Sequence, residues 1–257
     1  MSSSCKVIAI SNQKGGVGKT TTTCNLAAGL KEKGYRVLAV DLDPQGNLGF
    51  SIGADLDIDI RATIYDVLKS SIPARLAIQK TGTVDVIISN ILLSSIELEF
   101  TGTGREYLLK EALQSVLEYY DYVLLDTPPN LGILTINAFT AADSIVIPMV
   151  SDIFSLQGIA QLSETVERVK KSCNSHLSVA GILLTSFNPR THLAREIRGT
   201  AELISRDLNL SLFDSSIRRS VLVSEAQSLQ INLLNYAPKN NAAKDYRQFT
   251  DELLSRI

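Results

Sequence analysis

The stretch Asn12-Gln13-Lys14-Gly15-Gly16-Val17-Gly18-Lys19-Thr20-Thr21 decides the fold of this 257-residue chain. The apolar residues 7–10 before it predict a buried strand, and residues 20–33 after it predict a helix. A glycine-rich turn between a strand and a helix is typical of a phosphate-binding loop. The backbone can approach an anion closely there, and the N–H groups at the helix start point toward it. We therefore predict that Lys19 binds phosphate and that the Thr20 hydroxyl binds Mg²⁺.

The loop departs from the general pattern G-x-x-x-x-G-K-[ST]. Gln13 stands where the first glycine is expected, and Lys14 adds a second lysine inside the loop. An ordinary glycine-rich turn is the simpler alternative. However, Gly-Lys-Thr after a strand provides close approach of the backbone, a lysine for phosphate and a hydroxyl for Mg²⁺ together. The loop residues predicted to contact a nucleotide are Lys14, Gly15, Gly16, Val17, Gly18, Lys19, Thr20 and Thr21.

The composition indicates a soluble globular protein, with 45% hydrophobic residues and a formal net charge of −2. This charge argues against a basic coat over the whole surface but is compatible with a local basic patch. Cys5, Cys24 and Cys173 form no C-x-x-C motif, so we expect reduced thiols and no redox centre. The first five residues do not resemble a signal peptide, and no apolar run reaches the length of a bilayer span. We therefore expect a cytoplasmic protein.

Strand-like and helix-like segments alternate along the chain. Further strands are predicted at residues 36–40, 84–88, 122–126, 144–148 and 179–185. Helices are predicted around residues 64–68 and at residues 105–119, 133–142, 156–171 and 242–256. This alternation favours right-handed crossovers and an α/β fold with a doubly wound, mostly parallel sheet flanked by helices. Because no linker or repeat interrupts the pattern, we expect residues 1–257 to form one domain.

Acidic residues end two of the predicted strands, at the edge where α/β sheets bind ligands. Asp126 follows four apolar residues and precedes Thr-Pro-Pro, so we predict that its carboxylate binds Mg²⁺. Asp41 and Asp43 are separated by one residue, so both side chains point to the same face. Beside a bound triphosphate, one carboxylate would support the Mg²⁺ shell, and the other would orient the water that attacks the phosphate. Asp126, or one of the pair Asp41 and Asp43, could instead cap a turn.

Together these motifs resemble the ParA/Soj family of chromosome and plasmid partition ATPases, within the ParA/MinD superfamily and its deviant Walker A loop. The matching segments are residues 12–21, Asp41-Leu42-Asp43-Pro44-Gln45-Gly46-Asn47, Asp126-Thr127-Pro128-Pro129, Leu134-Thr135-Ile136-Asn137-Ala138 and Ser224-Glu225-Ala226. The likeness covers nearly the whole chain. It is to the short type of the family, which lacks an additional N-terminal DNA-reading domain.

The resemblance implies an ATPase that uses ATP and Mg²⁺ and hydrolyses ATP slowly until a ParB-type centromere-binding protein stimulates it. Members of this family form a homodimer with nucleotide between the subunits. The resemblance gives Lys14 a contact with the partner's phosphates and places Gly15 at the crowded interface. It also assigns Asp43 to hydrolysis and places Asp41 nearer the metal. Lys14, Lys19 and Asp43 are thus the predicted catalytic residues.

The resemblance also implies binding to double-stranded DNA without sequence preference, and hence association with the nucleoid. Arg190 and Arg219 match family arginines that are linked to DNA binding, and Arg195 and Arg198 lie nearby in the sequence. Guanidinium groups would contact phosphates and release counterions. The alternative is that these arginines are solvated surface residues, several of them paired with Glu196, Glu202 or Asp207.

The predicted nucleotide contacts beyond the phosphate loop are Asn188 and Arg218. The family often has Ile-Pro-Arg-Asn where this chain has Ile217-Arg218-Arg219-Ser220, so Arg218 replaces the proline that lines the adenine. The contacts with the base are therefore expected to differ from the family pattern. Arg218 is alternatively a second arginine for DNA binding.

Three other classes of protein share parts of this pattern. A MinD-like ATPase binds membrane through a basic amphipathic C-terminal helix, but the acids in residues 246–257 disfavour a lipid surface. A reductase of the nitrogenase iron protein type needs cysteines placed around an iron–sulfur cluster, which the spacing here does not match. A regulatory binder that acts by nucleotide state alone is the third. The leading hypothesis is a DNA-binding partition switch without membrane contact.

Overall fold

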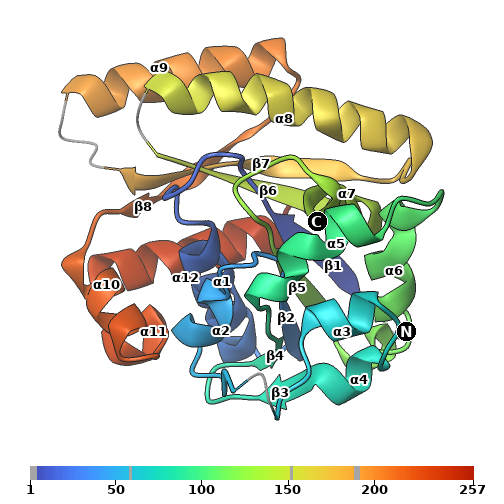
Figure 1. The fold of residues 1–257 in the computed structure, drawn as a ribbon. Helices are drawn as coiled ribbons and strands as arrows, with labels where there is room; N and C mark the ends of the chain where they lie inside the picture. Colours follow the sequence, from blue (N-terminus) through green and yellow to red (C-terminus); the bar gives the residue numbers. More distant parts are fainter. Residues whose placement is uncertain (1–4, 58–59, 151–152, 188–191) are drawn as a thin grey trace.

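The computed structural model of the chain describes residues 5–57, 60–150, 153–187 and 192–257. In this described part, eight strands form one sheet with the order β3-β4-β2-β5-β1-β6-β7-β8 (Figure 1). The strands are β1 (Lys6–Ile10), β2 (Val37–Asp41), β3 (Ile78–Lys80), β4 (Asp85–Ile87), β5 (Tyr122–Asp126), β6 (Ser144–Val150), β7 (Ser178–Phe187) and β8 (Leu212–Arg218). All neighbouring strands are parallel except β3 and β4. The predicted mostly parallel sheet is confirmed.

The three central strands finish level at their carboxyl ends. β2, β5 and β1 are almost entirely Val, Leu, Ile and Ala up to their last residues, and both of their faces are buried. Asp126, the last residue of β5, pairs in register with Ile10 of β1 and with Asp41 of β2. This register brings two buried carboxylates to the point where the loop after Ile10 begins.

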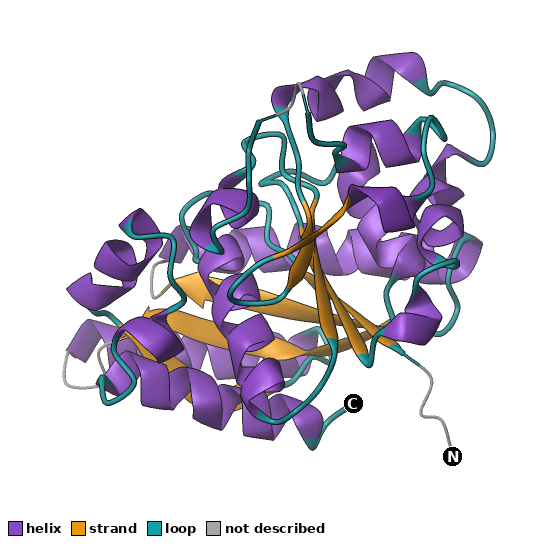
Figure 2. Cartoon of the chain, turned by 90° about the horizontal axis from the view of Figure 1, so that it is seen from below, coloured by secondary structure: helices purple, strands orange, loops and turns teal. Residues whose placement is uncertain are grey.

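Helices cover both faces of the sheet (Figure 2). One face packs against α1 (Lys19–Glu32), α2 (Asn47–Ser51), α10 (Val221–Ser228), α11 (Leu233–Tyr236) and α12 (Asn241–Leu254). The other packs against α3 (Ile64–Leu68), α4 (Ala74–Ala77), α5 (Ile96–Glu99), α6 (Leu108–Leu113), α7 (Ile133–Ala141), α8 (Ile153–Ser172) and α9 (His192–Asp207). None of the helices in the described ranges combines the length and the apolar character that crossing a membrane requires.

The apolar face of the C-terminal helix α12 is part of the core. Tyr246, Phe249 and Leu253 are almost completely buried. Thr250 lies so close to α1 that a Cβ added at Gly29 would come within 2.5 Å of the Thr250 hydroxyl oxygen. Glycine at position 29 is therefore what allows α1 and α12 to pack at this distance.

Two carboxylates of α12 also bind the backbone of the edge strand β8. Glu252 accepts hydrogen bonds from the N–H groups of Asp214 and Ser215, each at 2.8 Å. Asp245 accepts one from the N–H of Arg218, at 3.0 Å. These bonds satisfy strand donors that have no further strand beside them in the described sheet.

The helix predicted over residues 105–119 is broken into three pieces. They are the 3₁₀ turn η2 (Arg105–Tyr107), α6, and a second 3₁₀ turn η3 (Leu117–Tyr119). At the first break, between η2 and α6, the buried Asn137 side chain of α7 intervenes: its Oδ1 accepts from the Leu109 N–H at 3.0 Å, and its Nδ2 donates to the Arg105 carbonyl at 2.9 Å. The apolar periodicity of residues 105–119 predicts their buried face but contains no information about this partner.

The strands at the two edges of the sheet were not predicted from the sequence. β3 has three residues and is antiparallel to β4, so it is too short to show an alternating pattern. β8 reads Leu-Phe-Asp-Ser-Ser-Ile-Arg, which is too polar in its middle to stand out as an apolar run. A 3₁₀ turn, η1 (Ile91–Ser95), also follows β4 without a sequence signal.

We expect Asn137→Leu to lower the free energy of unfolding by about 1–3 kcal/mol, because it leaves the Leu109 N–H and the Arg105 carbonyl without their partner. The measurement is urea unfolding followed by circular dichroism. Gln114→Leu, an exposed position on the same side of the sheet, is the control and should change stability by less than about 0.5 kcal/mol. Equal effects of the two substitutions would contradict the role given to Asn137.

Candidate nucleotide-binding site

The phosphate loop between β1 and α1 is held in shape by side chains on both sides. Asn12 accepts a hydrogen bond from the Lys14 N–H at 2.9 Å, and its Nδ2 donates to the Pro148 carbonyl at 2.8 Å. The Thr185 hydroxyl donates to the Val17 carbonyl at 2.8 Å. Gly16 and Gly18 adopt φ of +74° and +85°, a region that glycine enters without strain. The loop is thus fixed to β6 and β7 before any ligand binds.

The side chain of Lys19 reaches back across the phosphate loop to Lys14. This side chain is buried, and its Nζ donates to the Lys14 carbonyl at 3.0 Å. Burial lowers the pKa of Lys19, while the nearby carboxylates of Asp126 and Asp43 raise it. A buried ammonium beside main-chain N–H groups at a helix start makes a site for a polyanion.

Thr20 and Asp126 form the part of the site that fits a divalent cation. The Thr20 hydroxyl donates to Asp126 Oδ2 at 2.6 Å, and the Thr23 hydroxyl donates to Oδ1 at 3.1 Å. Burial raises the pKa of Asp126 to about 7. Hydroxyl and carboxylate oxygens are ligands that Mg²⁺ prefers. Among the described residues, no group of three or more His, Cys, Asp and Glu side chains could hold a metal ion by itself. Phosphate oxygens of a bound nucleotide and water are further ligands of the kind that Mg²⁺ takes.

Asp41 holds the loop that carries Asp43. Its Oδ1 accepts from the Asp43 N–H at 3.0 Å, and its Oδ2 accepts from the N–H groups of Leu48 and Gly49 at 2.9 and 3.3 Å. Burial raises the pKa of Asp41 well above its ordinary value, and the charge of Asp126 adds to the effect. Both oxygens of Asp41 therefore bind backbone, which favours an indirect, loop-fixing role. Its predicted part in the metal site stays a prediction.

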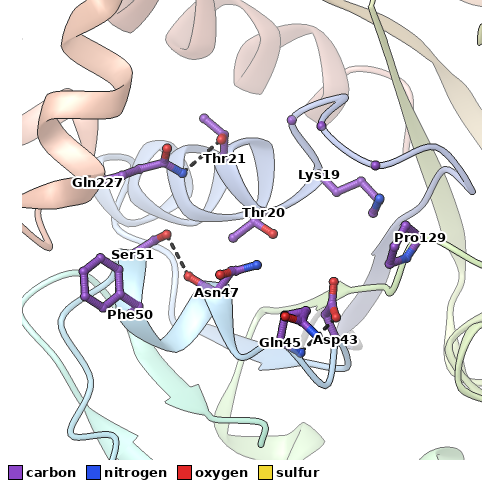
Figure 3. A pocket seen from close by; sticks show the side chains of 13 residues that line it. Lys19, Thr20, Thr21, Asp43, Gln45, Asn47, Phe50, Ser51, Pro129 and Gln227 are labelled. Carbon is purple, nitrogen blue, oxygen red and sulfur yellow. Dashed lines mark hydrogen bonds between the residues drawn. The ribbon is translucent and has the colours of Figure 1, made fainter. Parts of the chain in front are cut away.

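Two cavities adjoin at this edge of the sheet. The first, of about 490 Å³, is lined by Gly15, Gly16, Gly18, Lys19, Thr20, Thr21, Asp43, Gln45, Asn47, Phe50, Ser51, Pro129 and Gln227. The second, of about 270 Å³, is lined by residues of the phosphate loop and the start of α1, the end of β7, residues 217–221, 223 and 224, Gln227 and Tyr246. Figure 3 shows Lys19, Thr20 and Asp43 around the first cavity. Six of the eight predicted loop residues and Asp43 thus line one cavity, and Lys14 and Val17 are the two loop residues that do not line it.

Several lining residues were missed by the sequence analysis. Three of them follow β2 and β5 directly, beside the predicted acids, and this position in the sequence could have indicated that they line the site: Gln45, Asn47 and Pro129. Phe50 and Gln227 had none, because only the packing of α2 beside α1, and of α10 beside α2, brings them to the cavity.

The residues predicted for the base have mixed outcomes. Arg218 lines the second cavity, but its guanidinium is held by Asp245 through bonds of 2.8 Å from Nε and 2.6 Å from Nη2. This ion pair holds the guanidinium against α12, and both predicted roles of Arg218, in binding the base and in strengthening DNA binding, stay predictions. Asn188 lies outside the described residues.

The arginines predicted for DNA lie on two elements. Arg195 and Arg198 belong to α9, and Arg219 follows β8. Arg195 and Arg219 are exposed. Arg198 pairs with Glu202 at 3.1 Å, as we expect if this arginine is a paired surface residue. Arg190 lies outside the described residues.

The raised pKa of Asp126 predicts how stability depends on pH without metal and nucleotide. An aspartate in the unfolded chain titrates near pH 4, so between about pH 4 and 7 the folded state binds more protons. The free energy of unfolding should therefore fall, by a few kcal/mol, as the pH rises through this window. The pKa of Asp41 is raised as well, so Asp41 adds to this decrease in the free energy of unfolding.

Urea unfolding in EDTA at pH 5, 6, 7 and 8 measures this dependence. Asp126→Asn cannot ionise at position 126 and should flatten the curve, with its largest gain over the natural protein at pH 8. Parallel curves for the two proteins would contradict the assignment of the pH dependence to Asp126.

Comparison with known proteins agrees with this geometry. A family sequence model described as an AAA domain matches residues 5–179. The sporulation initiation inhibitor protein Soj of Bacillus subtilis is 42% identical over 252 residues, covering 96% of this chain and 98% of Soj. The chromosome partitioning protein ParA of Caulobacter vibrioides is 40% identical over 256 residues, covering 98% of this chain and 94% of ParA.

A solved structure is similar over almost the same length. A crystal structure titled cobyrinic acid a,c-diamide synthase from Mycobacterium smegmatis, with bound ATP analog and magnesium, has a TM-score of 0.87 at 34% identity. The match covers 97% of this chain and 94% of that one. The chain is therefore an ATPase with ATP and Mg²⁺ as its ligands. With its phosphate loop, its strand-end acids and these relatives, it belongs to the ParA/Soj family of partition ATPases.

Proposed function

We propose that the protein is an ATP-dependent switch that dimerises around nucleotide, binds DNA without sequence preference and hydrolyses ATP to drive chromosome or plasmid partition. The observation that carries the proposal is the position of the second loop lysine. Lys19 lines the first cavity, and Lys14 lies five residues earlier in the same phosphate loop. The family resemblance assigns such a second loop lysine to the phosphates of a second subunit, where its positive charge would stabilise the negative charge that develops.

Gly15 supports the same proposal. A Cβ added there would meet nothing within 4 Å, and its φ lies outside the positive range in which Gly16 and Gly18 require glycine. Within the described chain nothing demands glycine at this exposed position. A subunit or ligand packed directly against the loop would supply the requirement.

The proposed chemistry assigns different tasks to Lys19 and Asp43. Lys19 neutralises phosphate charge, and Asp43, at the cavity wall with its Oδ1 fixed by the Gln45 N–H at 3.0 Å, orients the attacking water. Thr20 and Asp126 would hold Mg²⁺. Asp41 fixes the loop that carries Asp43.

Lys19→Ala should abolish nucleotide binding, whereas Asp43→Ala should bind ATP, dimerise and fail to hydrolyse it. Equilibrium binding of a fluorescent ATP, mass in solution by light scattering, and phosphate release are the measurements. Asp214→Ala, an exposed aspartate on the edge strand, is the control. Normal turnover by Lys19→Ala, or an Asp43→Ala protein that stays monomeric in ATP, would contradict the assignments.

The DNA step of the proposal rests on exposed arginines. Arg219 is exposed and lines the second cavity, so one residue lies at both the proposed nucleotide site and the outer surface. Phosphate contacts by such residues give affinity without base reading. A ParB-type partner and localisation on the nucleoid belong to the same proposal.

Arg219→Ala should weaken binding equally on all DNA sequences and reduce the salt slope of the affinity by roughly one. The measurement is DNA binding by anisotropy with ATP, with ADP and without nucleotide, at two salt concentrations. Arg75→Ala removes the same charge from α4 and is the matched control. Unchanged DNA affinity in Arg219→Ala would remove this residue from the DNA surface, and equal affinity in all nucleotide states would contradict the switch.

The MinD-like alternative is less favoured because of α12. Its apolar side chains pack in the core, so the face that a membrane anchor would present to lipid is already covered. Flotation with anionic liposomes in ATP distinguishes the two functions, since only the membrane-binding alternative expects the protein to rise with the lipid.

A further inference from the structure

Gln227 connects α10 to the start of α1. Its Nε2 donates a hydrogen bond to the Thr21 hydroxyl oxygen at 3.0 Å, across 206 positions of sequence (Figure 3). Both residues line both cavities, as do Gly16 and Gly18, so the bond lies where the two cavities meet. No sequence motif assigns a role to Gln227.

The direction of this hydrogen bond has a chemical consequence. A threonine hydroxyl has one proton and two acceptor positions. When its oxygen accepts the amide proton of Gln227, the hydroxyl proton remains available for another acceptor. Thr21 lies in the first turn of α1, where free N–H groups and the helix dipole favour an anion. The phosphate chain of a nucleotide is the acceptor that this proton suits.

We propose that Gln227 is a positioning residue that directs the Thr21 hydroxyl proton toward bound phosphate, and that it thereby couples α10 to the occupied site. This inference rests on the proposed nucleotide site. The coupling extends to the DNA surface proposed above, because α10 begins at Val221, two residues after Arg219. Nucleotide occupancy would order the helix that continues from this arginine.

Two substitutions of similar size separate positioning from packing. Gln227→Met keeps the bulk and removes the donor, so ATP affinity should fall about 3- to 10-fold, the range of one hydrogen bond. Gln227→Glu should be worse than Met, because its carboxylate accepts the Thr21 proton and places a negative charge beside the phosphates. Because the negative charge alone would give this order, the route through Thr21 is tested separately by the double-mutant cycle below. Ser228→Ala, whose hydroxyl bonds only within α10, is the control.

A double-mutant cycle tests the route through Thr21. Thr21→Val removes the hydroxyl, so adding Gln227→Met to it should cost nothing further in ATP affinity, while Thr21→Ser should retain the sensitivity to Gln227→Met. Independent, additive losses would overturn the proposal. So would Gln227→Glu binding ATP as well as Gln227→Met, an outcome that remains readable even if Thr21→Val binds too weakly to measure.

Hydrogen exchange supplies the readout for the coupling. At saturating Mg-ATP, the amides of residues 221–228 should gain protection in the natural protein and gain clearly less in Gln227→Met. Equal protection in both would overturn the coupling to α10. Absence of ATP binding in the natural protein would instead defeat the proposed function itself, so the two failures are distinguishable.

Discussion

Two buried carboxylates side by side are the constraint on which this site depends. The parallel register of β2 and β5 places Asp41 and Asp126 at neighbouring strand ends, away from water. Burial makes the charged forms of both carboxylates unfavourable, and the charge of Asp126 adds to the effect at Asp41. The compensating groups are the hydroxyls of Thr20 and Thr23, the backbone N–H groups around α2, and the ammonium of Lys19. These groups belong to the phosphate loop with the start of α1 and to the loop carrying Asp43. The same interactions that stabilise the two buried carboxylates therefore also shape the cavity.

This arrangement explains why catalytic and structural tasks are difficult to separate here. Asp41 fixes the loop that aims Asp43, and Asn12 fixes the loop that aims Lys19. The residues that would contact phosphate are thus supported by neighbours whose own contacts are with backbone. A site supported in this way is largely formed before its ligand arrives, which favours tight and selective binding of a polyanion.

The sequence predicted the central strands and the phosphate loop because their signals are local. An apolar run before Gly-Lys-Thr, and Asp126 before two prolines, each carry their meaning within a few residues. It could not predict the first break in residues 105–119, which depends on Asn137, or the place of Gln227, which depends on how α10 packs against α2. The edge strand β8 was missed for a related reason: its polar middle is satisfied by carboxylates of α12, far along the chain.

Those α12 carboxylates affect how copies of this protein behave when crowded. An open strand at the end of a sheet invites strands of other molecules to join it, the first step of aggregation. At one end of this sheet Glu252 and Asp245 already occupy N–H groups of β8, and at the other β3 offers only three residues. The molecule can therefore accumulate at high local density while its sheets remain separate.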